Sequence, residues 1–191
     1  TFMRFMLTFI MVSLATSAAH AGESGSPGRA DSFAQGSWTA TTYGSATFGA
    51  DNRGNIYLAH AGVGYFVWDG VALHLEGVVG HTDAKQRFVP DSNTYGFDLL
   101  ARWHFWHDET WSVYFEGGAG MIWFEHAFPF AGTKQNFTPQ AGIGFTYRCS
   151  GACRLMAGVR WHHVSNASKH GSVRNPGFDG VMIYGGVACD F

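Results

Sequence analysis

The clearest pattern in this chain is the alternation of apolar and polar side chains. Between residues 95 and 105 every odd position is apolar, and the same parity recurs in the segments that begin at Val71 and Trp111. The even positions of these segments carry most of the polar groups: His74, Glu76, Asp98, Arg102, His104, Tyr114 and Glu116. Because side chains alternate between the two faces of a strand, this period of two predicts strands with one apolar face and one polar face.

Turn residues divide the chain into eight such strands. The predicted strands cover residues 37–49, 56–68, 71–81, 94–106, 110–124, 136–148, 153–165 and 179–191. Tight turns at 69–70, 107–109 and 150–152 alternate with long connections at 82–93, 125–135 and 166–178, while the first connection, 50–55, is shorter than this scheme predicts. An even number of strands with short turns on one rim and long loops on the other is typical of an outer-membrane barrel. The predicted fold is all-β, an eight-stranded antiparallel transmembrane β-barrel.

The polar face decides between a membrane barrel and a soluble one. Eight strands enclose room for side chains only, so a polar interior must form a paired network. That network would contain His74, Glu76, Asp98, Arg102, His104, Glu116 and Arg154, with the apolar face against lipid. Trp103 and Trp111 near the tight turns, and Trp123 and Trp161 near the long loops, would form two interfacial girdles. A soluble sandwich with the same strands is the alternative.

The first residues have the pattern of an export signal. Met3 and Arg4 precede an apolar stretch and then small residues that end in an Ala-x-Ala pattern at Ala21. We therefore expect a signal peptide at 1–21, a flexible polar segment at 22–36 and a barrel at 37–191. A retained anchor helix is the alternative, but the apolar stretch is shorter than the roughly 20 residues that a spanning helix needs.

Charge and cysteine content limit the partners and cofactors that the chain is expected to bind. Lys and Arg number 12 against 14 Asp and Glu, so nothing indicates a nucleic-acid partner. The tight turn at 150–152 separates Cys149 from Cys153, which makes a bridge between them plausible, and Cys189 would then be a free structural thiol. No second pair of ligands accompanies the cysteines, so we expect neither a metal nor a cofactor.

Three polar residues share the apolar parity of the last two strands. In the predicted strand 153–165 the odd positions are apolar up to Trp161, yet His163 and Ser165 follow at the same parity. Asp179 has the outward parity of the next strand and lies at its loop end. A base, a hydroxyl and an acid would meet on the lipid-facing side, where polar groups are costly without a function. His162 and Arg160 have lumen parity and are interpreted as part of the interior network.

The segment from Arg160 to Phe191 resembles the PagL-type lipid A 3-O-deacylases, which are also described as acyloxyacyl hydrolase-like outer-membrane enzymes. The resemblance rests on His-Val-Ser-Asn-Ala at 163–167, Asn-Pro-Gly at 175–177, and the acid at Asp179. Two positions depart from the family pattern: Asp179 stands where the best-known members have Glu, and Ser168 stands where Gly is often found. The shorter Asp requires His163 to lie closer.

The resemblance implies a role for each matching residue. Ser165 would be the nucleophile, His163 its general base and Asp179 the acid that orients the imidazole. Asn166, together with the backbone amides of Ala167 and Ser168, would form the oxyanion hole.

The same resemblance implies a substrate and a place. The reaction would remove the ester-linked 3-hydroxyacyl chain at the 3-position of lipid A, in lipopolysaccharide of the outer leaflet of a bacterial outer membrane. A homodimer is left open. Two alternatives remain at this point: a non-enzymatic structural or adhesion barrel, and an outer-membrane phospholipase or acyltransferase with the same nucleophile.

Overall fold

The computed structural model describes residues 32–169 and 171–191. The expected signal peptide at 1–21 and most of the segment 22–36 lie outside these residues. Ser32 to Gly36 form turns and a bend, and Phe33 within them is buried against the rings of Phe66 and His104. The polar composition of that segment did not predict this contact.

No helix among the described residues is both long enough and apolar enough to span a membrane.

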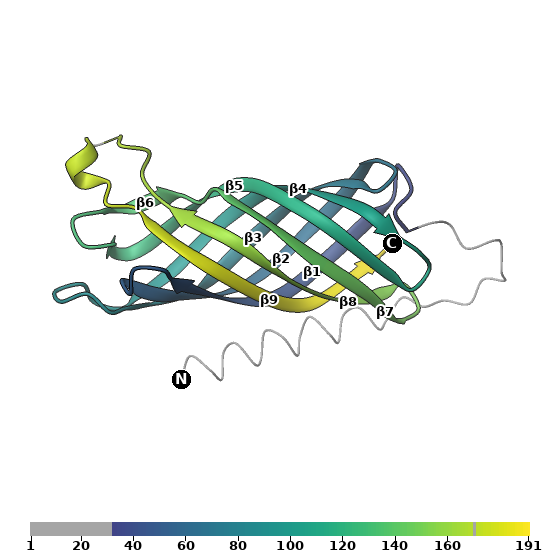
Figure 1. The fold of residues 1–191 in the computed structure, drawn as a ribbon, viewed down its shortest axis with the longest axis horizontal. Coiled ribbons are helices and arrows are strands. Elements are labelled where there is room, and N and C mark those ends of the chain that lie inside the picture. The colour runs from purple at the N-terminus through teal and green to yellow at the C-terminus, as the bar shows by residue number, and fades with distance from the viewer. Residues whose placement is uncertain (1–31, 170) are drawn as a thin grey trace. The chain divides into compact units, whose positions relative to one another are not determined.

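The described chain is a closed antiparallel β-barrel (Figure 1). Its elements are β1 (Trp38–Gly49), β2 (Gly54–Trp68), β3 (Val71–Ala84), β4 (Ser92–His107), β5 (Trp111–Phe128), β6 (Thr133–Phe137), β7 (Gln140–Ser150), β8 (Cys153–Val164), the 3-10 turn η1 (Ser172–Arg174) and β9 (Phe178–Asp190). β1 to β5 pair in chain order, β5 pairs with both β6 and β7, and β7, β8 and β9 follow in order. β1 pairs with β9, which closes the sheet. The predicted eight-stranded barrel is confirmed.

Nine strands occupy eight positions because the predicted strand 136–148 is divided. β6 and β7 both pair with β5, and Thr138 and Pro139 separate them. Proline has no backbone N–H to donate to a ladder, and at this point the Pro139 carbonyl accepts from the N–H of His163 at 3.0 Å. The two segments therefore continue along one line of the barrel wall, next to β8.

The strands on the long-loop rim extend further than their sequence predicted. β3 continues to Ala84, β4 begins at Ser92 and β5 continues to Phe128. The connections shrink accordingly to 85–91, 129–132 and 165–177, and only the last keeps its expected length. The residues at these hairpin ends are polar and typical of turns, so the sequence did not show that strand pairing continues beyond the apolar stretch.

The parity prediction is confirmed throughout the wall. Large apolar side chains are exposed on the outside: Leu73, Leu75, Tyr95, Phe97, Leu99, Trp103, Trp111, Phe115, Trp161, Val181 and Ile183 are examples. The predicted interior residues are all buried: His74, Glu76, Asp98, Arg102, His104, Glu116 and Arg154. This inverts the pattern of a soluble protein, because only a hydrocarbon environment favours an apolar outside with charges inside.

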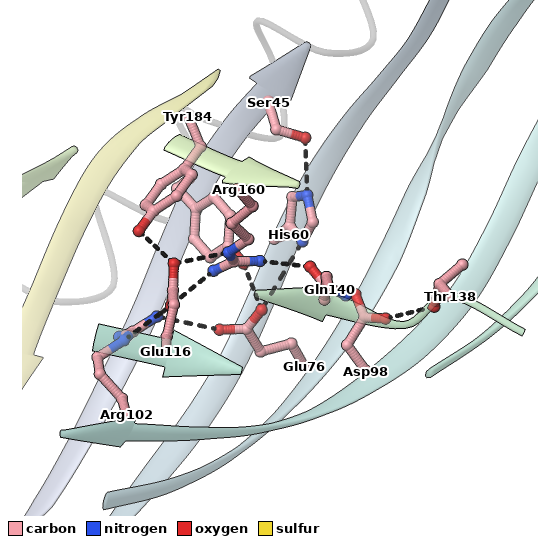
Figure 2. A network of polar contacts seen from close by, with 11 residues as sticks. Ser45, His60, Glu76, Asp98, Arg102, Glu116, Thr138, Gln140, Arg160 and Tyr184 are labelled. Carbon is pink, nitrogen blue, oxygen red and sulfur yellow. Dashed lines mark hydrogen bonds and ion pairs between the residues drawn. The ribbon is translucent and has the colours of Figure 1, made fainter. Parts of the chain in front are cut away.

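Figure 2 shows how the interior charges at Glu76, Arg102, Glu116 and Arg160 meet opposite charges, while Asp98 accepts a hydrogen bond from Thr138. Glu116 accepts from Arg160 Nε at 2.7 Å and from Arg102 Nη2 at 3.0 Å, and it also accepts from the Tyr184 hydroxyl. Glu76 accepts from Tyr43 and lies 3.8 Å from Arg102. Buried charges are tolerated when each meets an opposite charge and further hydrogen bonds.

The cysteine pairing differs from the one expected. Cys153 forms a disulfide with Cys189, and Cys149 is a free, exposed thiol. The register explains the error, since Cys153 lies directly opposite Cys189 across β8 and β9. In the hairpin from β7 to β8, Ser150 is the partner of Cys153, and an irregularity displaces Cys149 from the ladder.

This pairing predicts which thiol reacts. A maleimide added to the denatured, non-reduced protein should attach to one residue per chain, and peptide mapping should find it at Cys149. Cys149→Ser should remove the label entirely. Labelling at Cys189 would contradict the pairing.

Candidate active site

The site lies where β8 and β9 reach the long-loop rim, beside the connection that carries η1 (Figure 1). His163 and Asp179 are direct cross-strand partners in the β8–β9 ladder. Nδ1 of His163 lies 2.9 Å from Oδ1 of Asp179, and the carboxylate can only accept, so Nδ1–H donates. The structure thus brings together the base and the acid predicted from the sequence.

The pair faces outward rather than into the lumen. The side chain of His163 is 25% exposed and that of Asp179 is 55% exposed, whereas the neighbouring His162 is 1% exposed. His162 lies 3.1 Å from the Thr47 hydroxyl inside the barrel. These positions agree with the orientations predicted from parity, outward for His163 and into the lumen for His162.

The direct pairing of His163 with Asp179 also explains how the short side chain of an aspartate can reach the imidazole. Partner residues on adjacent antiparallel strands have Cβ atoms only about 4.5–5.5 Å apart. A short carboxylate therefore reaches the imidazole without the extra methylene of Glu. The departure from the family pattern at Asp179 leaves the hydrogen bond to the base intact.

A second donor fixes the acid. The indole Nε1–H of Trp161 donates to the same Asp179 oxygen at 2.9 Å, and the Trp161 ring stacks on His163 with centroids 5.6 Å apart. Trp161 was predicted only as a girdle residue. Its outward parity, two positions before His163, was the signal for this contact, because residues at i and i+2 share a face.

The third predicted residue, Ser165, follows His163 by two positions, directly after the end of β8. Its backbone exchanges two hydrogen bonds with Phe137, at 3.0 and 2.7 Å, which fixes its place beside β6. No hydrogen bond joins the Ser165 hydroxyl to His163 among the described residues. Catalytic hydrogen bonds are often absent before substrate binds and form in the complex.

The residues after Ser165 form a strained turn. Ala167 and Ser168 have φ of 52° and 59°, and Lys169 N–H donates to the Asn166 carbonyl at 3.1 Å. Two consecutive left-handed residues closed by this bond make a type I′ turn, which favours glycine. Gly at the position of Ser168 would relieve this strain. The N–H groups of Ala167 and Ser168 have no partner among the hydrogen bonds of the described residues.

The donors of Asn166 have partners within the chain. Its side-chain Nδ2 donates to Thr133 at 3.1 Å and to the Arg174 carbonyl at 2.6 Å, and its backbone N–H donates to Asn175 Oδ1 at 2.9 Å. The buried side chain of Asn166 therefore braces the turn that follows it. Asn175 adds a bond from Nδ2 to the Ser168 hydroxyl at 3.2 Å.

Arg53, in the connection between β1 and β2, holds the far end of the same loop. Its Nη1 donates to the carbonyls of Pro176 and Gly177, the residues that lead into β9 and Asp179. Sequence reasoning missed this residue, because nothing in the connection 50–55 indicates contact with a segment more than 120 positions away.

Fold and site together define an outer-membrane β-barrel with a histidine–carboxylate pair and a serine on its outward face. A family model described as lipid A 3-O-deacylase (PagL) matches residues 35–188. The chain belongs to this family, whose members are hydrolases. No curated protein sequence matches the chain significantly.

Solved structures agree with the fold. The outer membrane enzyme PagL superposes with a TM-score of 0.55 at 16% identity, covering 76% of this chain and 97% of that one. Neisserial surface protein A gives a TM-score of 0.60 at 12% identity, covering 81% and 96%. The N-terminal barrel domain of Pseudomonas aeruginosa OprF gives 0.55 at 18%, covering 82% and 98%. At these identities the likeness concerns the barrel alone.

Proposed function

We propose that this protein is a serine esterase that removes the ester-linked 3-hydroxyacyl chain from the 3-position of lipid A. The observation that carries the proposal is the 2.9 Å contact between His163 and Asp179 on the outward face. An imidazole and a carboxylate at a lipid boundary are costly unless they do chemistry. Family membership supplies the substrate class.

Acylation uses the three outward residues in order. Asp179 holds the proton on Nδ1 of His163, which leaves Nε2 as the base. When substrate binds, the Ser165 hydroxyl closes onto Nε2, gives up its proton, and its Oγ attacks the ester carbonyl. The bond to the sugar oxygen then breaks, and the imidazolium returns the proton to that oxygen.

Deacylation repeats the sequence with water. Water gives a proton to His163 and attacks the acyl carbonyl, so that the 3-hydroxy fatty acid leaves and Ser165 is restored. The free N–H groups of Ala167 and Ser168 are the proposed oxyanion donors, held in place by Asn166. One such donor typically contributes about 3 kcal/mol to the transition state.

The location of the three residues indicates which esters can reach them. The three residues lie on the outside of the wall at the long-loop rim, which in such barrels faces the cell exterior. The outer leaflet of the outer membrane consists of lipopolysaccharide, so an ester near the glucosamine would meet Ser165 without leaving the bilayer.

Mass spectrometry of lipid A tests this function. Lipid A from cells that express the protein should lose the mass of one 3-hydroxyacyl chain relative to cells that express Ser165→Ala. A gain of one chain would indicate an acyltransferase instead. Unchanged lipid A would leave a structural barrel or a phospholipase as the explanation.

The hydrogen bonds of Asp179 predict a graded series of variants. Asp179→Asn should lower kcat by roughly 10⁴-fold or less, since it mis-orients the base without deleting it. Trp161→Phe keeps the ring against His163 but removes one neutral donor, so we expect a loss of about tenfold. Initial rates on purified lipid A measure both. A fully active Asp179→Ala protein would mean that another acid orients His163.

A further inference from the structure

A pocket of about 510 Å³ opens on the barrel surface next to Ser165. Its apolar part is formed by Met121, Ala127 and Phe137, and its charged part by Lys134, Lys169 and Arg174. No carboxylate lines it. Asn166, the residue after Ser165, also lines the pocket, and Phe137 is the bridge partner of Ser165. The pocket therefore lies directly beside the proposed nucleophile.

The apolar part lies in one row with the nucleophile. Met121 is the cross-strand partner of Phe137, and Phe137 is the partner of Ser165. His163 and Asp179 continue the wall beyond Ser165, on β8 and β9. Across the barrel surface, the acid therefore lies on β9, the base and the nucleophile on β8 and its continuation, and the apolar part of the pocket on β6 and β5.

The three cations lie on two segments that are joined by hydrogen bonds. Lys134 lies on β6, whereas Lys169 and Arg174 lie on the connection 165–177. Asn166 joins the two, since its Nδ2 donates both to Thr133, next to Lys134, and to the carbonyl of Arg174. Loop motion therefore does not readily separate the charges.

These cations lack anionic partners in the protein. Lys134, Lys169 and Arg174 are exposed, and none forms an ion pair with a carboxylate among the described residues. A single lysine without an anionic partner would be an ordinary solvated surface charge. Three like charges around one pocket repel one another, and an anion placed among them relieves that repulsion.

We propose that this pocket binds the phosphate group of the glycolipid substrate, with the acyl chain to be cleaved lying along Phe137 and Met121. The inference rests on the proposed function, because it assigns the substrate of the same site. Arg and Lys are the side chains that hold phosphate, through charge-assisted hydrogen bonds. Phosphate recognition would hold the sugar so that its neighbouring ester lies at Ser165.

Binding to a matched pair of lipids tests the pocket without relying on catalysis. The probes are a 3-O-(3-hydroxyacyl)glucosamine 1-phosphate and the same lipid without phosphate, each titrated into the full-length Ser165→Ala protein in non-ionic detergent. We expect the phosphorylated lipid to bind about tenfold tighter or more, with the preference weakening as salt is raised. Equal affinities would overturn the proposal.

Three variants in the Ser165→Ala background locate the effect. Lys134→Ala/Lys169→Ala/Arg174→Ala should erase the preference while leaving the affinity for the phosphate-free lipid unchanged, which also shows that the barrel is folded. Lys85→Ala/Arg87→Ala removes two cations from the same rim outside the pocket and should keep the preference. Lys134→Arg/Lys169→Arg preserves charge and should keep it as well. A preference that survives the triple alanine change would contradict the site.

Hydrolysis of the two lipids by the unmodified chain separates the two proposals. Cleavage of both at equal kcat/KM would overturn the phosphate site and leave the esterase intact. A binding preference without any cleavage would overturn the esterase and leave an anionic-lipid site.

Discussion

Ser165→Ala is expected to abolish deacylation, with a loss of about 10⁶-fold in kcat, because no other group of the site can form the acyl-enzyme. His163→Ala should cost a similar factor, since Ser165 is a poor nucleophile without a base. Deacylation of purified lipid A, followed by release of the hydroxy fatty acid, measures both.

The effects of the two substitutions on kcat should not be additive. Residues that act as one unit lose most of the rate at the first substitution, so the double variant should be about as slow as either single variant. His162→Ala is the matched control, because it removes the adjacent imidazole from the lumen side. Normal activity in either Ser165→Ala or His163→Ala would remove that residue from the mechanism.

Arg160→Met is expected to give the largest loss of stability, about 3–5 kcal/mol. Arg160 is fully buried and bonds to both carboxylate oxygens of Glu116 (Figure 2). Its removal leaves Glu116 with a single guanidinium partner, Arg102, in a buried interior. Urea unfolding in detergent or lipid, followed by tryptophan fluorescence, measures the change.

A double change shows whether lost charge balance is the cause. Arg160→Met with Glu116→Gln removes one charge of each sign, so it should be less destabilising than Arg160→Met alone. Arg87→Met, an exposed loop cation, should lie within about 0.5 kcal/mol of the unmodified protein. If the double variant were the less stable of the two, packing rather than charge would explain the loss.

The barrel could be predicted because a period of two carries the orientation of every side chain on a strand. Once Asp98 and Arg102 were assigned to one face, the opposite face had to contact lipid, and the positions of His163 and Asp179 followed from their parity. Hairpin adjacency then placed the acid beside the base. These inferences need only local spacing.

The loops could not be predicted, because their contacts join residues that are distant in sequence. The bonds from Arg53 to the residues before Asp179 and from Asn166 to Thr133 depend on how strands meet around a closed barrel. The Cys153–Cys189 pair has the same origin, since it reflects the register of β8 against β9. The turn at Ala167 and Ser168 also lacks the glycine that signals left-handed backbone.

A phosphonate ester that mimics the acyl substrate tests most directly whether Ser165 is an activated nucleophile on the outward face. Intact mass analysis of the folded protein in detergent should show one covalent adduct, and peptide mapping should place it on Ser165. Ser165→Ala should give no adduct, and His163→Ala should form it far more slowly. An unmodified native protein, or an adduct that persists in Ser165→Ala, would contradict the proposed chemistry.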